Sequence, residues 1–139
     1  MIVPVILIVP PDEIALVEVA MVKPGWRPDW RGALEEPVAL WDGDALSEAL
    51  KLIERLPESE VMRCFAPGYG IRLHDDSVAR AEVLFCFQCH RALMIDLLNP
   101  RHKGVGATFD PDSDPAQELL SRFRSSAGRW RWPRLRAER

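Results

Sequence analysis

The chain has 139 residues, 47% of them hydrophobic and 28% charged, and a formal net charge of −3 at pH 7. This length fits one domain, and the composition excludes a collagen, a disordered acidic chain and a protein with several membrane spans. Three cysteines are too few, and odd in number, for a secreted disulfide scaffold. We therefore expect one domain with free thiols.

The chain opens with an apolar run over residues 2–9. A membrane-spanning helix needs about 20 residues, and a secretory signal needs a basic segment before its apolar run. This run is too short to span a membrane, and no basic segment precedes it. We expect a buried strand here and a cytoplasmic protein, because the cytosol keeps thiols reduced.

The next segments predict a strand, a loop, a short strand and a helix. Residues 14–22 are rich in β-branched side chains and predict a strand, although their apolar spacing also fits a short helix. Three prolines and two glycines predict an irregular loop over residues 23–37, and a short strand follows at 37–41. A helix is expected from Asp44 to Leu56, with Asp42 or Asp44 as its cap and Pro57 as its stop. Its apolar side chains recur at helical spacing at Leu46, Ala49, Leu50, Ile53 and Leu56.

The second half of the chain predicts mostly strands. An extended segment at 61–65 and a turn at 66–70 precede strands at 71–74, 79–88, 92–98 and 107–109. A last helix begins at Asp114 and stops near Gly128, with Gln117 completing a capping box. The fold class that follows is α+β, with an antiparallel β-meander of about four to five strands and two helices packed on one face. Residues 1–128 would form this domain, and 129–139 a basic Arg/Trp tail.

The most specific local motif is Cys86-Phe-Gln-Cys89-His90. Its pattern fits c-type haem attachment, half of a zinc site, a redox-active dithiol, or two buried core residues. Haem attachment requires export, for which the sequence has no signal, and burial in the core is the interpretation that we favour. Zinc is the cofactor that stays open, and its ligands would be Cys64, Cys86, Cys89 and His90.

Charge is distributed unevenly along the chain. Residues 12–60 contain twelve acids and five bases, residues 61–128 are balanced, and residues 129–139 contain five arginines and one glutamate. An acidic half disfavours nucleic acid and favours a basic partner through electrostatic steering. Tryptophan is enriched at interface anchors. The predicted partner-binding residues are therefore Trp26, Trp30, Glu35, Glu36, Trp41, Asp42 and Glu48. The tryptophans could instead pack in the core.

Enzyme motifs are lacking. There is no nucleophile elbow and no glycine-rich phosphate loop, and His74, Asp75 and Asp76 in one turn are typical of a surface turn. The acidic run 110–114 lacks the glycine and glutamate that an EF-hand loop needs, so it predicts a helix cap. The Arg/Trp tail could bind a partner or dock on the protein's own acidic half.

From Arg63 onward the chain resembles a family of uncharacterised small bacterial proteins. The resembling residues are Arg63-Cys64, Pro67, Tyr69-Gly-Ile71, Cys86-Phe-Gln-Cys89, Phe109-Asp110 and Leu119-Leu120. They fall within residues 63–123. The resemblance implies a recurring α+β core that includes the three cysteines, and it implies no activity, cofactor or catalytic residue.

Together these features predict a non-enzymatic bacterial binding protein. Its specific form would be an inhibitor or immunity-type protein that neutralises a basic partner such as a toxin domain. The alternatives are a small metalloprotein with structural zinc on Cys64, Cys86 and Cys89, and a thiol-redox protein that uses the CxxC pair.

Overall fold

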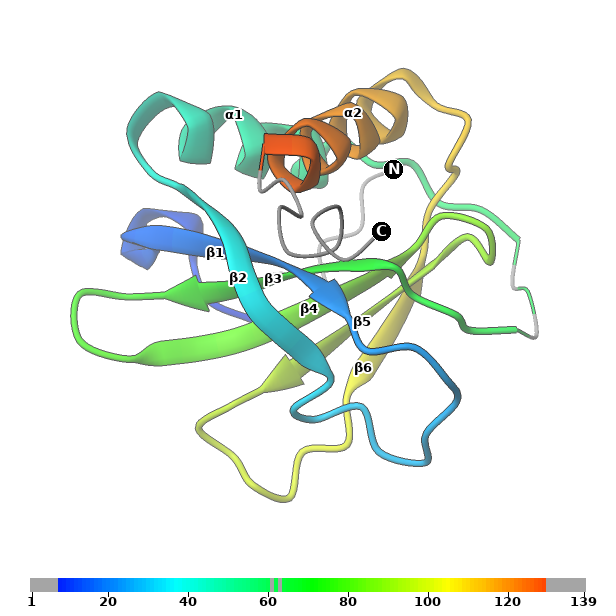
Figure 1. The fold of residues 1–139 in the computed structure, drawn as a ribbon, viewed down its shortest axis with the longest axis horizontal. Helices are drawn as coiled ribbons and strands as arrows, with labels where there is room; N and C mark the ends of the chain where they lie inside the picture. Colours follow the sequence, from blue (N-terminus) through cyan, green and yellow to red (C-terminus); the bar gives the residue numbers. More distant parts are fainter. Residues whose placement is uncertain (1–7, 61, 63, 130–139) are drawn as a thin grey trace, which may run out of the picture.

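The computed structural model describes residues 8–60, 62 and 64–129. It is an α+β fold in two layers, with both helices above one face of a single sheet (Figure 1). The sheet is antiparallel throughout, in the order β2-β1-β3-β4-β5-β6. In chain order, the strands and α-helices of the fold are β1 (Leu16–Val22), β2 (Leu34–Trp41), α1 (Gly43–Glu54), β3 (Tyr69–His74), β4 (Ala79–Cys86), β5 (Arg91–Asp96), β6 (Val105–Thr108) and α2 (Asp114–Arg129).

The predicted fold class and the helices on one face are confirmed, but the strand number is wrong, since the sheet has six strands. Residues 14–22 form a strand rather than a helix because β1 pairs with β2 on one side and β3 on the other. The sheet is also not a simple meander. After β2 the chain passes through α1 and returns on the opposite side of β1, so the four-strand meander is β3 to β6 and the β1–β2 hairpin stands before it.

Some predicted segments fall partly outside the described residues. This holds for residues 2–7 of the N-terminal run, for Val61 and Arg63 of the segment at 61–65, and for residues 130–139 of the Arg/Trp tail. Ile8 and Val9 form a bend, and Met62, Cys64 and Phe65 have no regular structure. Within the described part of the chain, no helix has the length and apolar character needed to cross a membrane.

The core lies between the helices and the sheet. The predicted apolar stripe of α1 is buried, and Leu56 is buried just beyond the helix end. On α2, the ring of Phe123 stacks on Tyr69 at 5.1 Å and lies 5.4 Å from Trp41. The indole N–H of Trp41 donates a hydrogen bond to Ser126 Oγ at 3.1 Å. These contacts fix α2 across β2 and β3.

No helix of the described residues lies over the opposite face of the sheet. Strand pairing places Glu18 of β1, Arg72 of β3 and Glu82 of β4 side by side, because Glu18 pairs with Arg72 and Arg72 with Glu82. Farther along the same strands, a second apolar cluster lies under the β1–β2 loop. It consists of Ala20, Val22, Ala33, Leu34 and Leu84, with Trp30 and Phe65 packed against it. This face provides the candidate site.

Candidate functional site

The β1–β2 loop, residues 23–33, places two tryptophans over the second apolar cluster. The loop is closed by the N–H of Lys23, which donates to Ala33 O at 2.9 Å, and by the N–H of Ala33, which donates to Trp30 O at 3.2 Å. Gly25 has a φ of 97°, a backbone conformation that favours glycine. Trp30 meets Phe65 edge to face at 5.2 Å, so the loop packs on the segment that precedes β3.

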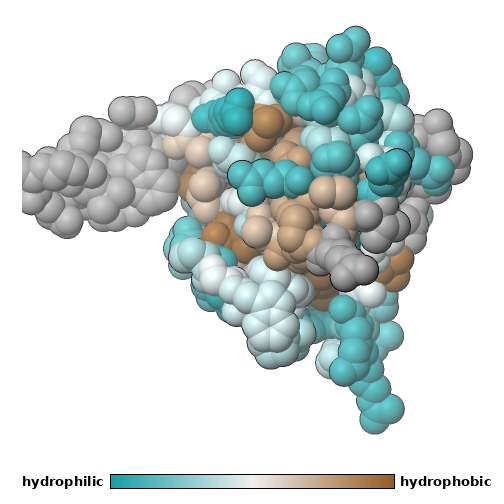
Figure 2. Space-filling model, turned by 90° about the vertical axis from the view of Figure 1, so that its right-hand side faces the viewer, coloured by the Kyte–Doolittle hydropathy of each residue, from teal (hydrophilic) through white to brown (hydrophobic). Residues whose placement is uncertain are grey.

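Trp26, Trp30 and Phe65 form what we call the aromatic groove. Two adjoining hollows of about 260 and 570 Å³ share these three rings. Trp26 is 79% exposed although it has a large apolar surface. Figure 2, which looks onto the side of the molecule at the right of Figure 1, shows apolar side chains bordered by hydrophilic ones. Exposed aromatic side chains around a hollow are typical of binding anchors.

Positive charges surround the groove. Lys23 lines the smaller hollow, and Arg91 and Lys103 line the larger one. The guanidinium of Arg91 lies 5.4 Å from the ring centre of Phe65, and that of Arg27 lies 6.0 Å from the ring centre of Trp30. Both distances are typical of cation–π contacts. Within the described residues, none of these four cations forms an ion pair with a carboxylate.

A third hollow, of about 380 Å³, continues past Lys103 and is lined also by Asp29, Arg31, Arg101 and His102. Arg31, in the β1–β2 loop, connects this loop to the end of β5 and the β5–β6 loop. Its Nη2 donates to the carbonyls of Asp96, Asn99 and His102 at 2.8–3.1 Å. This contact makes the β5–β6 loop, which includes Lys103, part of the groove's wall.

The other end of the open face contains an ion-pair network of Glu18, Arg72, His74 and Glu82. Arg72 Nη1 lies 3.0 Å from Glu18 Oε1, and Arg72 Nη2 lies 2.9 Å from Glu82 Oε2. His74 Nε2 lies 2.8 Å from Glu18 Oε1. Burial alone would raise the pKa of Glu18, but the hydrogen bonds to His74 and Arg72 outweigh burial and lower it. The carboxylates there therefore already have cationic partners.

The turn between β3 and β4 is structural, as its sequence indicates. Backbone N–H groups of Val78 and Ser77 donate to Asp75 Oδ1 and lower the pKa of that carboxyl. Arg80 pairs with Asp75 at 3.2 Å and lies 3.5 Å from Glu13. A hollow of about 500 Å³ lined by Asp12, Glu13, Asp75 and Asp76 lies beside this turn, and two of its four carboxylates contact Arg80.

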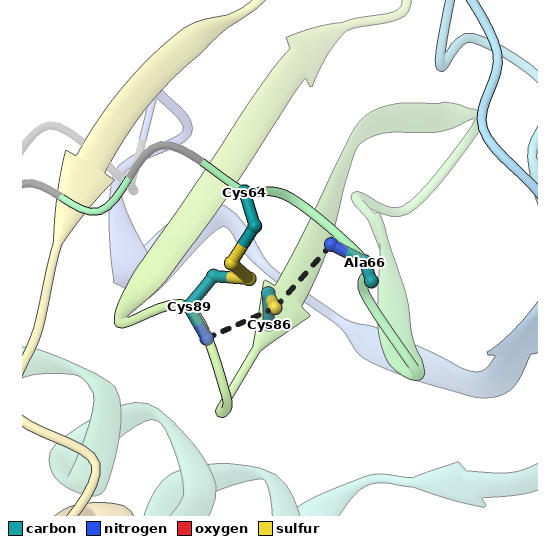
Figure 3. Close-up of a disulfide and its surroundings, with 4 residues drawn as sticks. All are labelled: Cys64, Ala66, Cys86 and Cys89. Carbon is teal, nitrogen blue, oxygen red and sulfur yellow. Dashed lines mark hydrogen bonds between the residues drawn. A yellow bond between two sulfur atoms is a disulfide. The ribbon is translucent and has the colours of Figure 1, made fainter.

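The cysteines differ from the predicted free thiols. Cys64 and Cys89 form a disulfide with a Cα–Cα distance of 5.7 Å, and Cys86 alone is free (Figure 3). The prediction failed because the segment before β3 passes over the β4–β5 turn and brings together cysteines that are 25 residues apart. The core interpretation is confirmed for Cys86 and Cys89, each 1% exposed, whereas Cys64 is exposed and lines the larger hollow.

The predicted zinc ligands lie near one another but have other partners. The disulfide occupies the sulfurs of Cys64 and Cys89, and His90 Nδ1 lies 3.1 Å from Ser59 Oγ. No group of three or more metal-ligating side chains is gathered within the described residues. Zinc binding therefore stays a prediction about the reduced chain.

The predicted partner surface is divided between two regions. Trp26 and Trp30 are in the aromatic groove, but Trp41 is a correction, since it is only 6% exposed and packs on α2. Glu35 is half-buried and Glu36 exposed on the edge strand β2. Asp42 is exposed before α1, and Glu48 pairs with Arg122 at 2.9 Å. None of these four carboxylates lines the groove.

Sequence reasoning missed Phe65, Arg91 and Lys103. Each is on a different segment, and only the folded sheet brings them to the two tryptophans. The one available signal was the position of Phe65 directly after Cys64.

Comparisons with known proteins give no relative. The chain matches no protein-family model, and no similar curated protein or solved structure was found. The function must therefore be argued from the site itself.

Proposed function

We propose that the chain is a non-enzymatic binding protein, and that its aromatic groove binds an acidic segment of another protein. One observation supports this most strongly. Lys23, Arg27, Arg91 and Lys103 surround the groove without a carboxylate partner among the described residues, whereas Arg72 and Arg80 on the same sheet both have one.

The groove combines the two properties that such binding requires. Trp26, Trp30 and Phe65 offer apolar area that gains free energy when it is removed from water. The surrounding cations then select the sign of the partner's charge and raise the rate of encounter. Acidic side chains that flank an apolar anchor complement this arrangement.

A protein partner fits the charge distribution better than a nucleic acid. Nucleic-acid binding needs an extended basic surface, because each phosphate contact requires a cation. Here the net charge is −3, and the cations without an ion-pair partner among the described residues are concentrated around the two hollows that meet at Trp30. A short acidic segment matches the charge around the groove.

The sign of the partner's charge is the point at which the proposal differs from the sequence-based prediction. That prediction joined the tryptophans with acids nearby in the sequence and so favoured a basic partner. The groove instead places Trp26 and Trp30 among lysines and arginines. An inhibitory role against a toxin domain stays a prediction.

The test uses a fluorescein-labelled peptide of alternating glutamate and phenylalanine, about twelve residues long. We expect its fluorescence anisotropy to rise on titration with the protein and the affinity to fall as salt is added. A lysine–phenylalanine peptide of the same length and a single-stranded oligothymidylate are the comparison probes. Tighter binding of either comparison probe would overturn the proposal.

Two substitutions locate the site. Trp26→Ala and Lys103→Glu should each weaken binding of the acidic peptide by about tenfold, the size of a small hot-spot loss. Lys51→Glu is the matched control, because Lys51 is an exposed lysine on α1, on the other face of the sheet. Equal losses for Lys103→Glu and Lys51→Glu would indicate nonspecific charge attraction and would exclude the groove as the site.

A further inference from the structure

The third cysteine lies next to the disulfide. The backbone N–H of Cys89 donates a hydrogen bond to Cys86 Sγ at 3.2 Å, and the N–H of Ala66 donates to the same sulfur at 3.4 Å. Ala66 and Cys64 belong to the segment before β3, and Cys89 to the β4–β5 turn. Cys86 therefore contacts both segments that the disulfide joins. Figure 3 shows its sulfur on the Cys89 side of the disulfide.

We propose that these three cysteines undergo intramolecular thiol–disulfide exchange, in which Cys86 replaces Cys64 as the disulfide partner of Cys89. Cys86 is the last residue of β4, and Cys89, three residues later, is the third residue of the turn at 87–90. In a β-turn, the Cα atoms of two residues three apart lie within about 7 Å, which is close to the range that a disulfide can bridge. The alternative pairing therefore fits the local chain geometry.

The exchange is balanced without any oxidant or reductant. Cys86 first loses its thiol proton to water, and the thiolate attacks Cys89 Sγ. A Cys86–Cys89 bond forms while the Cys64–Cys89 bond breaks, and the electron pair of the broken bond remains on Cys64. The Cys64 thiolate then takes up a proton from water. The two backbone N–H groups at Cys86 Sγ would stabilise the negative charge of the attacking sulfur.

Exposure differs between the two thiols. Cys86 is 1% exposed, whereas Cys64 is exposed at the wall of the larger hollow. Exchange thus transfers the free thiol from the core to the protein surface. The product has a reactive cysteine beside the groove, where the starting pairing has none.

The exchange also affects the groove, and this part of the inference rests on the proposed function. Cys64 directly precedes Phe65, which packs against Trp30. Breaking the Cys64–Cys89 bond removes the covalent link that holds this segment on the β4–β5 turn. We therefore expect the acidic peptide to bind more weakly after exchange.

The first experiment maps the free thiol. The folded full-length protein is incubated with N-ethylmaleimide near pH 8, and the labelled cysteine is identified by peptide mass spectrometry without reduction. The expected product has the label on Cys64 and a Cys86–Cys89 disulfide, in about tenfold excess over label on Cys86, since exposed thiols react fastest. Label on Cys86 with the original disulfide intact would overturn the proposal.

Cys86→Ser is the control for this measurement. It retains Cys64 and Cys89 but has no attacking thiol, so it should take up no label. Labelling of Cys64 in this variant would show reduction from outside rather than exchange, and would overturn the proposal. The wild-type labelling rate should also be independent of protein concentration, because the reaction is intramolecular.

Cys64→Ser provides a second, independent measurement. After oxidation with glutathione disulfide it should lose both thiols and form the Cys86–Cys89 bond, and failure to do so would overturn the proposal. This variant should bind the acidic peptide about tenfold more weakly than Cys86→Ser, which retains the original disulfide. If no variant binds the peptide, the proposed function fails while the thiol mapping still decides the exchange.

Discussion

Two regions of the same open sheet face differ in whether their cations are paired with carboxylates. In the ion-pair network, Arg72 lies between two carboxylates, at 3.0 Å from Glu18 and 2.9 Å from Glu82. In the aromatic groove, Arg27 and Arg91 lie over the rings of Trp30 and Phe65, and within the described residues no carboxylate pairs with them. The network is half-buried to buried, whereas the groove is open.

This difference separates a structural role from a binding role. A buried carboxylate such as Glu82, 3% exposed, is tolerated in the sheet because its cation is in place. Among the described residues, the groove cations pair with no buried acid, so we do not expect the fold to depend on their charge. Substitutions in the network should therefore change stability, and substitutions in the groove should change binding.

The largest effect is expected for Arg72→Met. It leaves Glu82 buried without its cation, and removing one partner of a buried ion pair typically costs about 3–5 kcal/mol. The measurement is the free energy of unfolding from urea denaturation. The double variant Arg72→Met with Glu82→Leu is the control and should recover most of the loss. A single variant as stable as the wild type would show that the network is not structural.

The sequence predicted the layers of this fold but not its charge arrangement. The apolar stripe of α1 is a local pattern, and it identified the buried face of that helix correctly. The network was not predictable, because it depends on the register that pairs Glu18 with Arg72 and Arg72 with Glu82. No local pattern specifies which strands become neighbours.

The candidate site was predictable only in part, for the same reason. Trp26 and Trp30 stood out because large aromatic residues in a loop rich in proline and glycine require an explanation. The negative net charge of residues 12–60 then suggested that acids surround these tryptophans, whereas lysines and an arginine line the hollows beside them. The charges that surround the groove at Arg91 and Lys103 come from the second half of the chain, which is balanced in sequence but not in space.

A smaller effect is expected for Gly70→Ala, at the boundary between the two regions. A Cβ at this position would lie 2.9 Å from Val83 O and would also meet the side chain of Leu34. Overpacking of this kind costs about 1–3 kcal/mol. Gly68→Ala is the matched control, because a Cβ there meets nothing within 4 Å. Equal unfolding free energies for the two variants would contradict the tight packing of β3 on the second apolar cluster.

A smaller, pH-dependent effect is expected at Glu18. Its folded-state pKa is lowered, so its contribution to stability is present above the ordinary glutamate value of about 4.3 and is lost as pH falls through the lower folded value. The pairs of Glu18 are partly exposed, so solvent screens them and we expect a contribution of less than about 1 kcal/mol. The stability difference between the wild type and Glu18→Gln should thus shrink as pH falls below about 4. A stability difference that grows as pH falls would show that the folded-state pKa of Glu18 is raised rather than lowered.

The smallest change in stability is expected for Trp26→Ala, although this residue is central to the proposed groove. Its side chain is 79% exposed, and substitutions of exposed side chains usually change the free energy of unfolding by less than about 0.5 kcal/mol. Trp41→Ala, in the core, is the contrasting variant and should cost about 3–5 kcal/mol. If Trp26→Ala were as destabilising as Trp41→Ala, the exposed ring would be part of the fold rather than a binding anchor. If it leaves stability unchanged and still weakens peptide binding, the loss belongs to the surface alone, because the folded state is the same.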